Sequence, residues 1–559
     1  MLDIQTDVAK NGEEIIKVNG ICLHSPYNPT EEAKYFVKKH YRPADIQLLI
    51  GYGKGYIYRE LSKQKNEDEE ILVLEPLLKN IPDVVYVDGE NQKEIEMTLR
   101  SAIHVTDSVN IIVAPNYEKM VASKIKDILL WVKEHLYSNI VIQNTLNLNA
   151  EKWYMNFLNN CFYAAMKDHP ISDLYYQHNM PIVIASGGPS LTKQLVLLKK
   201  YRNQIILLCS GTTINSLLKE NIVPDYLFSV DGSKIYYEHF KNISANLSHT
   251  KVVYSMEHYY KIGPLLNSSE AYFFVSEVFQ KLSHPFSLFS SKDLCSLAGG
   301  GSVANYAYAL ALKMTTGNIA FIGQDLAYTN FQTHAENNLN RKKLSDEEVK
   351  KRGLFYTEGY NEDEKVLTDH PFYQMKKSFE ILCRRFDGQN RTFNCTEGGI
   401  LIEEFMNIPF QQFLERNCRN NCNGRSISKT AVEASVDRKK VVQGFATILL
   451  LLDELEKILK QCVEKIIHHS LLDHAIVDFL GEQDSKIQKL MDQTGIGVVF
   501  QKIDAVVLQK FRPKLEETDQ EIYNRVYDQN YYLYNEMYKK TIEVRGKVKK
   551  TYDYYQKER

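Results

Sequence analysis

The sequence predicts an α/β protein in which Rossmann-like N-terminal and central domains are followed by an all-α C-terminal domain. Short apolar runs alternate with helical segments up to about residue 405, which indicates parallel sheets covered by helices. Many of these runs end in Gly, Ser or Asp, at the carboxyl ends of strands where ligands bind in open α/β sheets. Beyond residue 405 the strand-like runs stop and apolar residues recur at helical spacing.

Length, composition and charge are typical of a large globular protein. The chain has 559 residues, of which 44% are hydrophobic and 25% charged, so we expect about three domains. Its 68 basic and 70 acidic residues give a formal net charge of −2, which gives no reason to expect a nucleic-acid partner. We see no secretory signal and no apolar run of the ~20 residues that span a membrane. Nine scattered cysteines without zinc-site spacing are typical of reduced cytoplasmic thiols.

The predicted domain borders lie at residues 160 and 405. Residues 1–160 form an α/β domain that includes a bridging helix, with the strand candidates IQLLIGYG (46–53) and DVVYVDG (83–89). Residues 161–405 form the central catalytic α/β domain, in which residues 337–364 are predicted to be a loop or lid. Residues 406–559 form a helical domain that is a candidate for acceptor binding.

Two helices of this last region are predicted from side-chain periodicity. Residues 441–467 place apolar side chains at three- and four-residue steps, which predicts one buried face. A tyrosine stripe follows the same spacing and either packs on neighbouring helices or binds a protein. Its members are Tyr523, Tyr527, Tyr531, Tyr534 and Tyr538.

An N-terminal glycine turn, Gly51-x-Gly53-x-Gly55, lies between a strand candidate and a helix start, and Glu75 ends the next strand candidate. This order is typical of a dinucleotide or methyltransferase fingerprint, in which amides hold an anion and an acid holds a ribose hydroxyl. Glycines at such turns also permit close packing of a helix on a strand. A cofactor site therefore remains open, although a structural turn is favoured.

Central glycine-rich turns have the composition of a phosphate-binding site. Residues 186–190, Ser-Gly-Gly-Pro-Ser, join a strand candidate to a helix start, where the backbone can approach an anion. Residues 299–302, Gly-Gly-Gly-Ser, precede a second helix, for which Ser302 is the expected N-cap. Two such helix starts side by side would flank a phosphate. Asp231, at another strand end, is a candidate for binding ribose hydroxyls, a cation or an acceptor.

Five motifs resemble the motility-associated factor family of bacterial flagellin glycosyltransferases. They are ASGGPSL (185–191), PDYLFSVDGS (224–233), GGGSVANYAYALALK (299–313), AFIGQDLAYT (320–329) and NCTEGG (394–399). HSPYNPTEEA (24–33), GYGKGY (51–56) and LEP (74–76) resemble that family's N-terminal region. The central region is also similar to bacterial lipooligosaccharide sialyltransferases, which use a CMP-sugar, and to an archaeal hydroxymethylpterin diphosphokinase.

The resemblance implies that the chain transfers a nonulosonic acid, of the pseudaminic or legionaminic type, from its CMP conjugate to Ser or Thr of flagellin, in support of flagellum assembly and motility. It implies no further cofactor and leaves a divalent metal open, although Asp231 and Asp325 are candidate cation ligands. By analogy with the sialyltransferases, CMP lies across four turns. They contain Ser186, Gly187, Gly188, Pro189 and Ser190; Ser210, Gly211 and Thr212; Gly300, Gly301 and Ser302; and Gly323, Gln324 and Asp325.

Sugar transfer requires a base that deprotonates the acceptor hydroxyl, and three residues are candidates. Glu397 follows a strand candidate between turn residues and is a base or a substrate ligand. His370 precedes a helical segment much as the sialyltransferase base does. Asp231 is the third candidate, and His334 is a weaker option.

Other functions remain open. The resemblance to the archaeal enzyme allows a pterin diphosphokinase that uses ATP or GTP with magnesium. A non-catalytic flagellin-binding or export factor, in which the glycine turns have no catalytic role, is an alternative from a different class. A methyltransferase at the N-terminal glycine turn is the fourth reading. The oligomeric state is open in each case.

Overall fold

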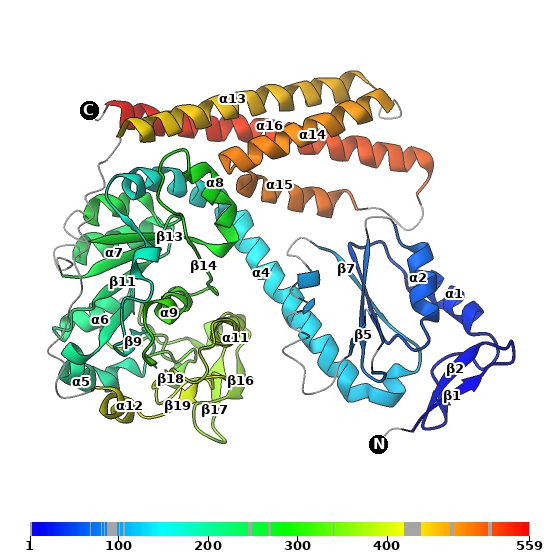
Figure 1. Cartoon of the computed structure of the whole chain (residues 1–559), viewed down its shortest axis with the longest axis horizontal. Coiled ribbons are helices and arrows are strands. Elements are labelled where there is room, and N and C mark those ends of the chain that lie inside the picture. The colour runs from blue at the N-terminus through cyan, green and yellow to red at the C-terminus, as the bar shows by residue number, and fades with distance from the viewer. Residues whose placement is uncertain are drawn as a thin grey trace. The chain divides into compact units, whose positions relative to one another are not determined.

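The computed structural model describes residues 3–557 apart from 67–68, 80, 83, 87–94, 96–97, 100, 104–106, 244–246, 248, 267–269, 339, 419–437, 470–473 and 513–516. Contacts divide the chain into two compact units. The N-terminal unit consists of Met1–Asn149 with Gln501–Leu533, and the central unit consists of Ala150–Phe500 with Tyr534–Arg559. The helices α4 (Tyr117–Met166) and α16 (Asp519–Lys557) each contribute residues to both units (Figure 1).

The N-terminal unit contains a parallel sheet in the order β6-β5-β4-β7. Every residue of the central strand β4 is buried, as expected for a parallel strand covered on both faces. The first strand of this sheet lies in the middle, with its successors on one side and the last strand on the other, which is a Rossmann-like arrangement. The strands are β4 (Ile46–Ile50), β5 (Glu70–Glu75), β6 (Val85–Tyr86) and β7 (Val109–Val113).

The described residues of the N-terminal unit before α4 also contain the helices α1 (Pro29–His40) and α2 (Tyr56–Gln64) and a small antiparallel sheet. These helices contact each other. The antiparallel sheet consists of β1 (Ile4–Val8), β2 (Glu14–Val18) and β3 (Ile21–Cys22). Of the strand candidate at residues 83–89, β6 is present, and residues 83 and 87–89 lie outside the described residues.

The central unit is built on a parallel sheet in the order β14-β13-β12-β11-β10-β9-β15-β18-β19, with β8 beside β13. After the short strand β8, the chain runs through β9 near the middle, moves outward to β14, and returns to the other side of β9 at β15. The two Rossmann-like sheets confirm the predicted fold class. The strands are β8 (His169–Pro170), β9 (Ile182–Ala185), β10 (Ile206–Ser210), β11 (Tyr226–Ser229), β12 (Lys251–Ser255), β13 (Ala271–Ser276), β14 (Ser296–Leu297), β15 (Ile319–Ile322), β18 (Thr392–Asn394) and β19 (Met406–Asn407).

Helices cover both faces of the central sheet. Figure 1 shows α5 (Leu191–Tyr201), α6 (Thr213–Lys219) and α7 (Lys234–Ile243) on one face and α9 (Val303–Met314) on the other. The helices lie on opposite faces because the connections are right-handed and the strand order reverses direction at β9. Other helices of the unit are α8 (Ser283–Phe286), α11 (His370–Arg385) and α12 (Phe410–Asn417), with the 3₁₀ turns η1 (Ile171–Leu174), η2 (Arg202–Gln204), η4 (Tyr260–Leu266), η5 (Glu277–Leu282) and η6 (Thr329–Phe331).

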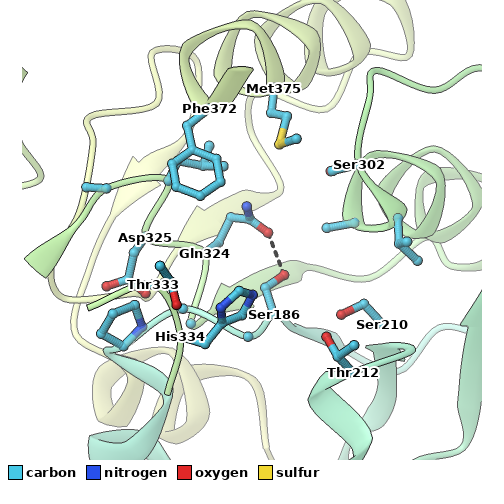
Figure 2. A pocket seen from close by; sticks show the side chains of 18 of the residues that line it. Ser186, Ser210, Thr212, Ser302, Gln324, Asp325, Thr333, His334, Phe372 and Met375 are labelled. Carbon is cyan, nitrogen blue, oxygen red and sulfur yellow. Dashed lines mark hydrogen bonds between the residues drawn. The ribbon is translucent and has the colours of Figure 1, made fainter. Parts of the chain in front are cut away.

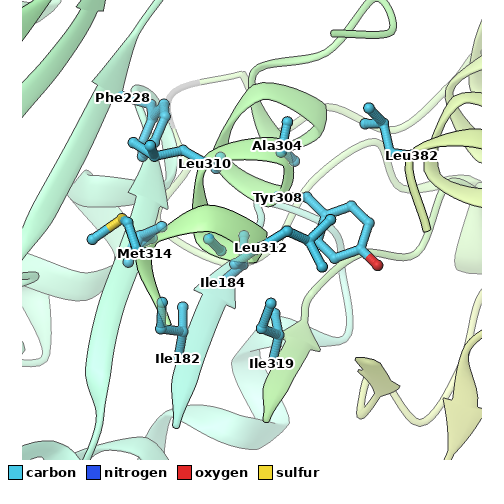
Figure 3. Close-up of a cluster of buried hydrophobic side chains, with 14 of the residues drawn as sticks. Ile182, Ile184, Phe228, Ala304, Tyr308, Leu310, Leu312, Met314, Ile319 and Leu382 are labelled. Atoms are coloured by element: carbon cyan, nitrogen blue, oxygen red, sulfur yellow. The ribbon is translucent and has the colours of Figure 1, made fainter. Parts of the chain in front are cut away.

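The core of the central unit lies between α9 and the sheet (Figure 3). The small side chains of α9 are buried, and they allow the helix to contact β9, β10 and β11. Tyr308 of α9 is also buried, and its hydroxyl is 2.8 Å from the Thr392 hydroxyl. The buried small residues are Ala304, Ala307, Ala309 and Ala311.

The described residues of the segment 337–364 are not a plain loop, so the loop alternative was wrong, and the lid alternative stays a prediction. These residues contain the helix α10 (Asp346–Lys351) and the strand β16 (Phe355–Glu358), which pairs with β17 (Lys365–Thr368). A capping box between Ser345 and Glu348 starts α10. The Ser-x-x-Glu pattern that marks such a helix start was present in the sequence.

The last described part of the chain is helical, as predicted. It contains α13 (Arg438–His468), α14 (His474–Thr494), α15 (Gly497–Lys510) and α16, and none of the helices in the described residues is long and apolar enough to cross a membrane. The predicted apolar face of α13 is confirmed, because the side chains at its three- and four-residue steps are buried. They are Val441, Phe445, Ile448, Leu452, Leu455, Leu459, Cys462 and Ile466.

The tyrosine stripe of α16 is not its buried face. Of the five tyrosines in the stripe only Tyr534 is buried, with 3% exposure, and its hydroxyl donates to Asp484 of α14 at 2.6 Å. Beyond this residue the helix buries a different, less aromatic face. That face consists of Met537, Thr541, Val544, Val548 and Tyr555.

Candidate functional site

A cavity of about 170 Å³ lies at the carboxyl ends of β9, β10 and β15. These strands are adjacent, and the order of the sheet reverses between β9 and β15, which is the switch point where open α/β sheets bind ligands. Most of the predicted nucleotide-binding residues meet here. Those that line the cavity are Ser186, Gly187, Gly188, Pro189, Ser210, Gly211, Thr212, Ser302, Gly323, Gln324 and Asp325.

Hydrogen bonds join the turn after β9 to the turn after β15. The Gly188 N–H donates to the Gly323 carbonyl at 2.8 Å. The Ser186 hydroxyl donates to Gln324 Oε1 at 2.5 Å, a bond that is drawn in Figure 2. A Cβ on Gly188 would lie only 2.1 Å from Asp325 Oδ2, so this close approach requires glycine.

Asp325 fixes the start of α5. Its carboxylate accepts the Ser190 hydroxyl at 2.7 Å and the Ser190 N–H at 3.2 Å. Because the carboxyl group is fully buried, desolvation raises its pKa to about 6, against the opposing effect of the Ser190 donors. Ser190 itself does not line the cavity, so we assign it a positioning role.

The start of α9 forms a second wall of the cavity. Ser302 is the N-cap, as predicted, and its hydroxyl oxygen accepts from the Asn305 N–H at 3.2 Å. Residues 303 and 304 line the cavity, and amides of a first helical turn have no partner within the helix. Gly300 and Gly301 shape this turn from outside the cavity. A Cβ on Gly300 would lie 2.0 Å from the Ser378 Cβ of α11, and Gly301 has a φ of +83°.

Two polar groups beside Gly187 have no hydrogen-bond partner among the described residues, although both are buried. They are His334 Nδ1 and Asn338 Nδ2. A Cβ on Gly187 would lie 2.8 Å from Asn338 Nδ2 and 3.4 Å from the His334 ring. Buried polar atoms without partners are rare in native folds. His334 lines the cavity, and Asn338 lies beside Gly187 at its edge, so this end of the cavity suits a polar ligand.

His334 is the titratable ring of this cavity, and burial lowers its pKa below the ordinary value of 6.5. A hydrogen bond to the backbone of Asn340 opposes the shift. Nδ1 has no partner in the described structure, so a neutral ring that carries its proton on Nε2 has a free lone pair on Nδ1. In that form the imidazole can accept a proton.

The candidate bases Glu397, His370 and Asp231 do not line the cavity. Glu397 is exposed, and its Oε1 accepts from the Phe410 N–H at 2.9 Å at the start of α12. His370 is exposed at the start of α11, with its ring 5.0 Å from that of Phe355. Asp231 closes its own turn by accepting from the Ser233 N–H at 2.6 Å.

Apart from His334, which was predicted only as a weaker option for the base, several cavity residues escaped the sequence analysis because they come from helices and from the segment after β15. Figure 2 shows Phe372 and Met375 of α11 across the cavity from Ser210 and Thr212. These two residues lie one turn apart on α11, whose N-cap is Asp369. The additional lining residues are Tyr236, Val303, Ala304, Leu326, Ala327, Thr333, His334, Phe372 and Met375.

The N-terminal glycine turn is filled by the protein's own side chains. The buried Glu75 carboxylate accepts from the Tyr52 N–H at 2.6 Å and from the Tyr117 hydroxyl at 2.7 Å. His24 Nε2 accepts from the Lys54 N–H at 3.0 Å, and burial lowers the His24 pKa to about 4. Amides that would meet a phosphate are therefore already bonded, which favours the structural reading of this turn.

Within the described part of the chain, no three His, Cys, Asp or Glu side chains are grouped closely enough to hold a metal ion. Of the two candidate cation ligands, Asp325 lines the cavity and Asp231 does not.

Comparisons with known proteins agree with this architecture. Residues 155–331 match the model of a family described as 6-hydroxymethylpterin diphosphokinase MptE-like. The chain is similar in fold to the structure of Maf glycosyltransferase from Magnetospirillum magneticum AMB-1, with 14% identity over 98% of this chain and 93% of that chain, and a TM-score of 0.59. A comparison with curated proteins gives no match. The motif resemblance is thus confirmed: an MptE-like central region lies in a chain with the fold of a Maf glycosyltransferase.

Proposed function

We propose that this chain is a glycosyltransferase that moves a nonulosonic acid, of the pseudaminic or legionaminic type, from its CMP conjugate to Ser or Thr of flagellin. One observation supports the proposal most strongly. The cavity at the switch point combines two helix starts, hydroxyl groups and the partnerless Nδ1 of His334, a set that suits an anionic nucleotide. The fold is similar to that of a structure named as a Maf glycosyltransferase, which supports transfer of a sugar.

In this proposal the CMP phosphate lies between the turns at 186–190 and 300–302. The leaving phosphate gains negative charge as its bond to the anomeric carbon breaks, and fixed N–H groups and hydroxyls stabilise that charge without reorganisation. Asn338 Nδ2 is a further donor that lacks a partner in the described structure. Phe372 and Met375 provide an apolar wall that excludes water from the reacting bond.

His334 is the general base in this proposal. The acceptor oxygen attacks the anomeric carbon, the bond to phosphate breaks, and CMP leaves with the bonding electrons. The acceptor proton passes to His334 Nδ1, which has its lone pair free because the lowered pKa keeps the ring neutral near pH 7. Glu397, His370 and Asp231 lie outside the cavity, so we assign them no step.

We place the reaction in the cytoplasm, since every cysteine in the described residues is free and free thiols are typical of reducing compartments. The helices after residue 438 are candidates for the surface that binds flagellin.

A pterin diphosphokinase is the second candidate, because the MptE-like match covers residues 155–331. That activity would use ATP or GTP with magnesium. Asp325 is the carboxylate among the described residues that line the cavity, and its oxygens already accept from Ser190. To bind magnesium, the Asp325 carboxylate would have to give up its hydrogen bonds from Ser190. The diphosphokinase is therefore the less favoured of the two candidates.

Calorimetric titration of the full chain with CMP and with ATP, each with and without magnesium, separates the two candidates. The glycosyltransferase proposal predicts that CMP binds without magnesium. Binding of magnesium-ATP by a chain that fails to bind CMP would overturn it in favour of the diphosphokinase.

A further inference from the structure

A second cavity, of about 540 Å³, adjoins the first and has a different chemical character. The two cavities share Thr333, His334 and Phe372 as lining residues. We call the second cavity the basic pocket, because its permanently charged lining residues within the described structure are all cations. They are Arg341, Lys342 and Arg352.

Arg352 is held in place at the wall of the basic pocket. Its Nη1 donates to the Tyr328 hydroxyl at 2.9 Å, and that hydroxyl donates to Asp369 Oδ2 at 2.5 Å. The guanidinium lies 3.6 Å from the same carboxylate oxygen, and its side chain is 37% exposed. Because Asp369 also caps α11 by accepting from the Phe372 N–H at 3.0 Å, its charge is shared among several donors. Arg352 is thus oriented but keeps donor groups for a ligand.

The two other cations reinforce the positive charge of the basic pocket. Lys342 pairs with Glu348 at 2.6 Å, whereas Arg341 is exposed and forms no ion pair with another described residue. Arginine has a planar set of donors that matches a carboxylate or a phosphate. The pocket is therefore suited to an anionic group.

Nonulosonic acids carry two anionic groups on one carbon when they are activated. Their anomeric carbon bears both the sugar carboxylate and the oxygen of the CMP phosphate. A protein that binds such a donor needs two adjacent anion sites, with the reacting bond between them. The glycine-lined cavity and the basic pocket are adjacent, and His334 belongs to both.

We propose that the basic pocket binds the carboxylate of the donor sugar, with Arg352 as its main partner and Arg341 as a second cation. This assignment rests on the proposed function. It explains how the chain selects an acidic sugar, because a neutral sugar nucleotide would leave the pocket's cations without a partner.

Binding of CMP, of CMP-N-acetylneuraminic acid and of the carboxyl methyl ester of that donor tests the assignment. The wild-type chain is expected to bind the acid about 10-fold or more tightly than the ester, since a charge-assisted hydrogen bond contributes on this scale. Arg352→Gln and Arg341→Gln should each reduce this preference while leaving the affinity for CMP unchanged. Lys351→Gln is the matched control, because Lys351 is 77% exposed, does not line the basic pocket and pairs with Glu347.

Each result leads to a distinct conclusion. A wild-type chain that does not bind CMP contradicts the proposed function itself. A chain that binds CMP but does not distinguish acid from ester overturns the carboxylate assignment alone. Arginine variants that weaken CMP and the acid equally, with an unchanged thermal unfolding midpoint, also overturn it, because the pocket would then hold the phosphate. Arg341 has no ion pair in the described chain, so its variant tests the assignment even if Arg352→Gln fails to fold.

Discussion

Asp325, at the end of β15, accepts the Ser190 hydroxyl at 2.7 Å and the Ser190 N–H at 3.2 Å, at the start of α5. This pair joins two turns that are distant in sequence and adjacent in the sheet. It sets the distance between the helix start and the strand end, and thereby the width of the glycine-lined cavity. The buried carboxylate is thus part of the framework of the site.

Asp325→Ala should destabilise the central unit by about 1–3 kcal/mol, because it leaves the buried donors of Ser190 without an acceptor. Nucleotide affinity should fall as well, since the turn at 186–190 loses its anchor. Asp325→Asn retains an acceptor oxygen and should have a smaller effect on both quantities. Chemical denaturation and CMP titration measure them. Equal stability of the alanine variant and the wild-type chain would show that the pair does not anchor the turn.

Gly188→Ala should reduce CMP binding sharply. The added Cβ would lie 2.1 Å from Asp325 Oδ2 and 2.6 Å from the Gly323 carbonyl, so the two turns must move apart. Gly398→Ala is the control, because a Cβ there meets nothing within 4 Å. The measurement is the dissociation constant for CMP by calorimetry. Unchanged binding in the Gly188 variant would place the nucleotide elsewhere.

His334→Ala should lower kcat by about 10²–10⁴-fold, the usual contribution of a general base. His370→Ala is the matched control, since this exposed imidazole lies outside the cavity, and it should retain turnover. Initial rates of sugar transfer to purified flagellin measure both variants. A full rate in the His334 variant, or a comparable loss in both, would contradict the assigned base.

The rate of transfer should also depend on pH in one direction. A base must be neutral, and burial lowers the pKa of His334 below 6.5, so activity should be constant near pH 7 and fall as pH decreases through this lowered pKa. The dependence of kcat on pH measures the effect. Activity that instead rises with acidification would indicate that the protonated imidazole is the active form.

Glu75→Ala should increase amide hydrogen exchange in the N-terminal glycine turn, because the Tyr52 N–H and the Tyr117 hydroxyl lose their common acceptor. Mass spectrometry of peptides that cover residues 46–60 measures this change. We also expect no heat on titration with S-adenosylmethionine, since these amides are bonded within the protein. Saturable binding of that cofactor to the wild-type chain would restore the methyltransferase reading.

The fold could be predicted largely from local patterns. Buried parallel strands such as β9 are short apolar runs followed by turn residues, and α13 displays its buried face directly in its spacing. The tyrosine stripe of α16 did not identify the buried face of that helix. Helical periodicity shows that residues share a face, but it does not show which face is buried. Met537 and Val544 are buried, whereas most tyrosines of the stripe are not. Tertiary contacts determine which face of the helix is buried.

The candidate site could be predicted only in part. Strand-end glycines such as Gly187 mark the switch point, because sheet topology brings the carboxyl ends of neighbouring strands together. The same logic selected Asp231, but β11 is separated from β9 by β10. His334 and Phe372 come from segments without strand-end signals, and tertiary structure alone brings them to the cavity. The sequence did not identify Arg352 as a binding residue for the same reason, since it lies in a segment that was predicted to be a loop or lid.

The mass of intact flagellin, compared between cells that contain this protein and cells that lack it, tests the central claim most directly. The account predicts that flagellin loses mass in whole multiples of one nonulosonic acid when the gene is deleted. It also predicts that the wild-type chain restores the mass and that His334→Ala does not. Flagellin of identical mass in both cells would contradict the account.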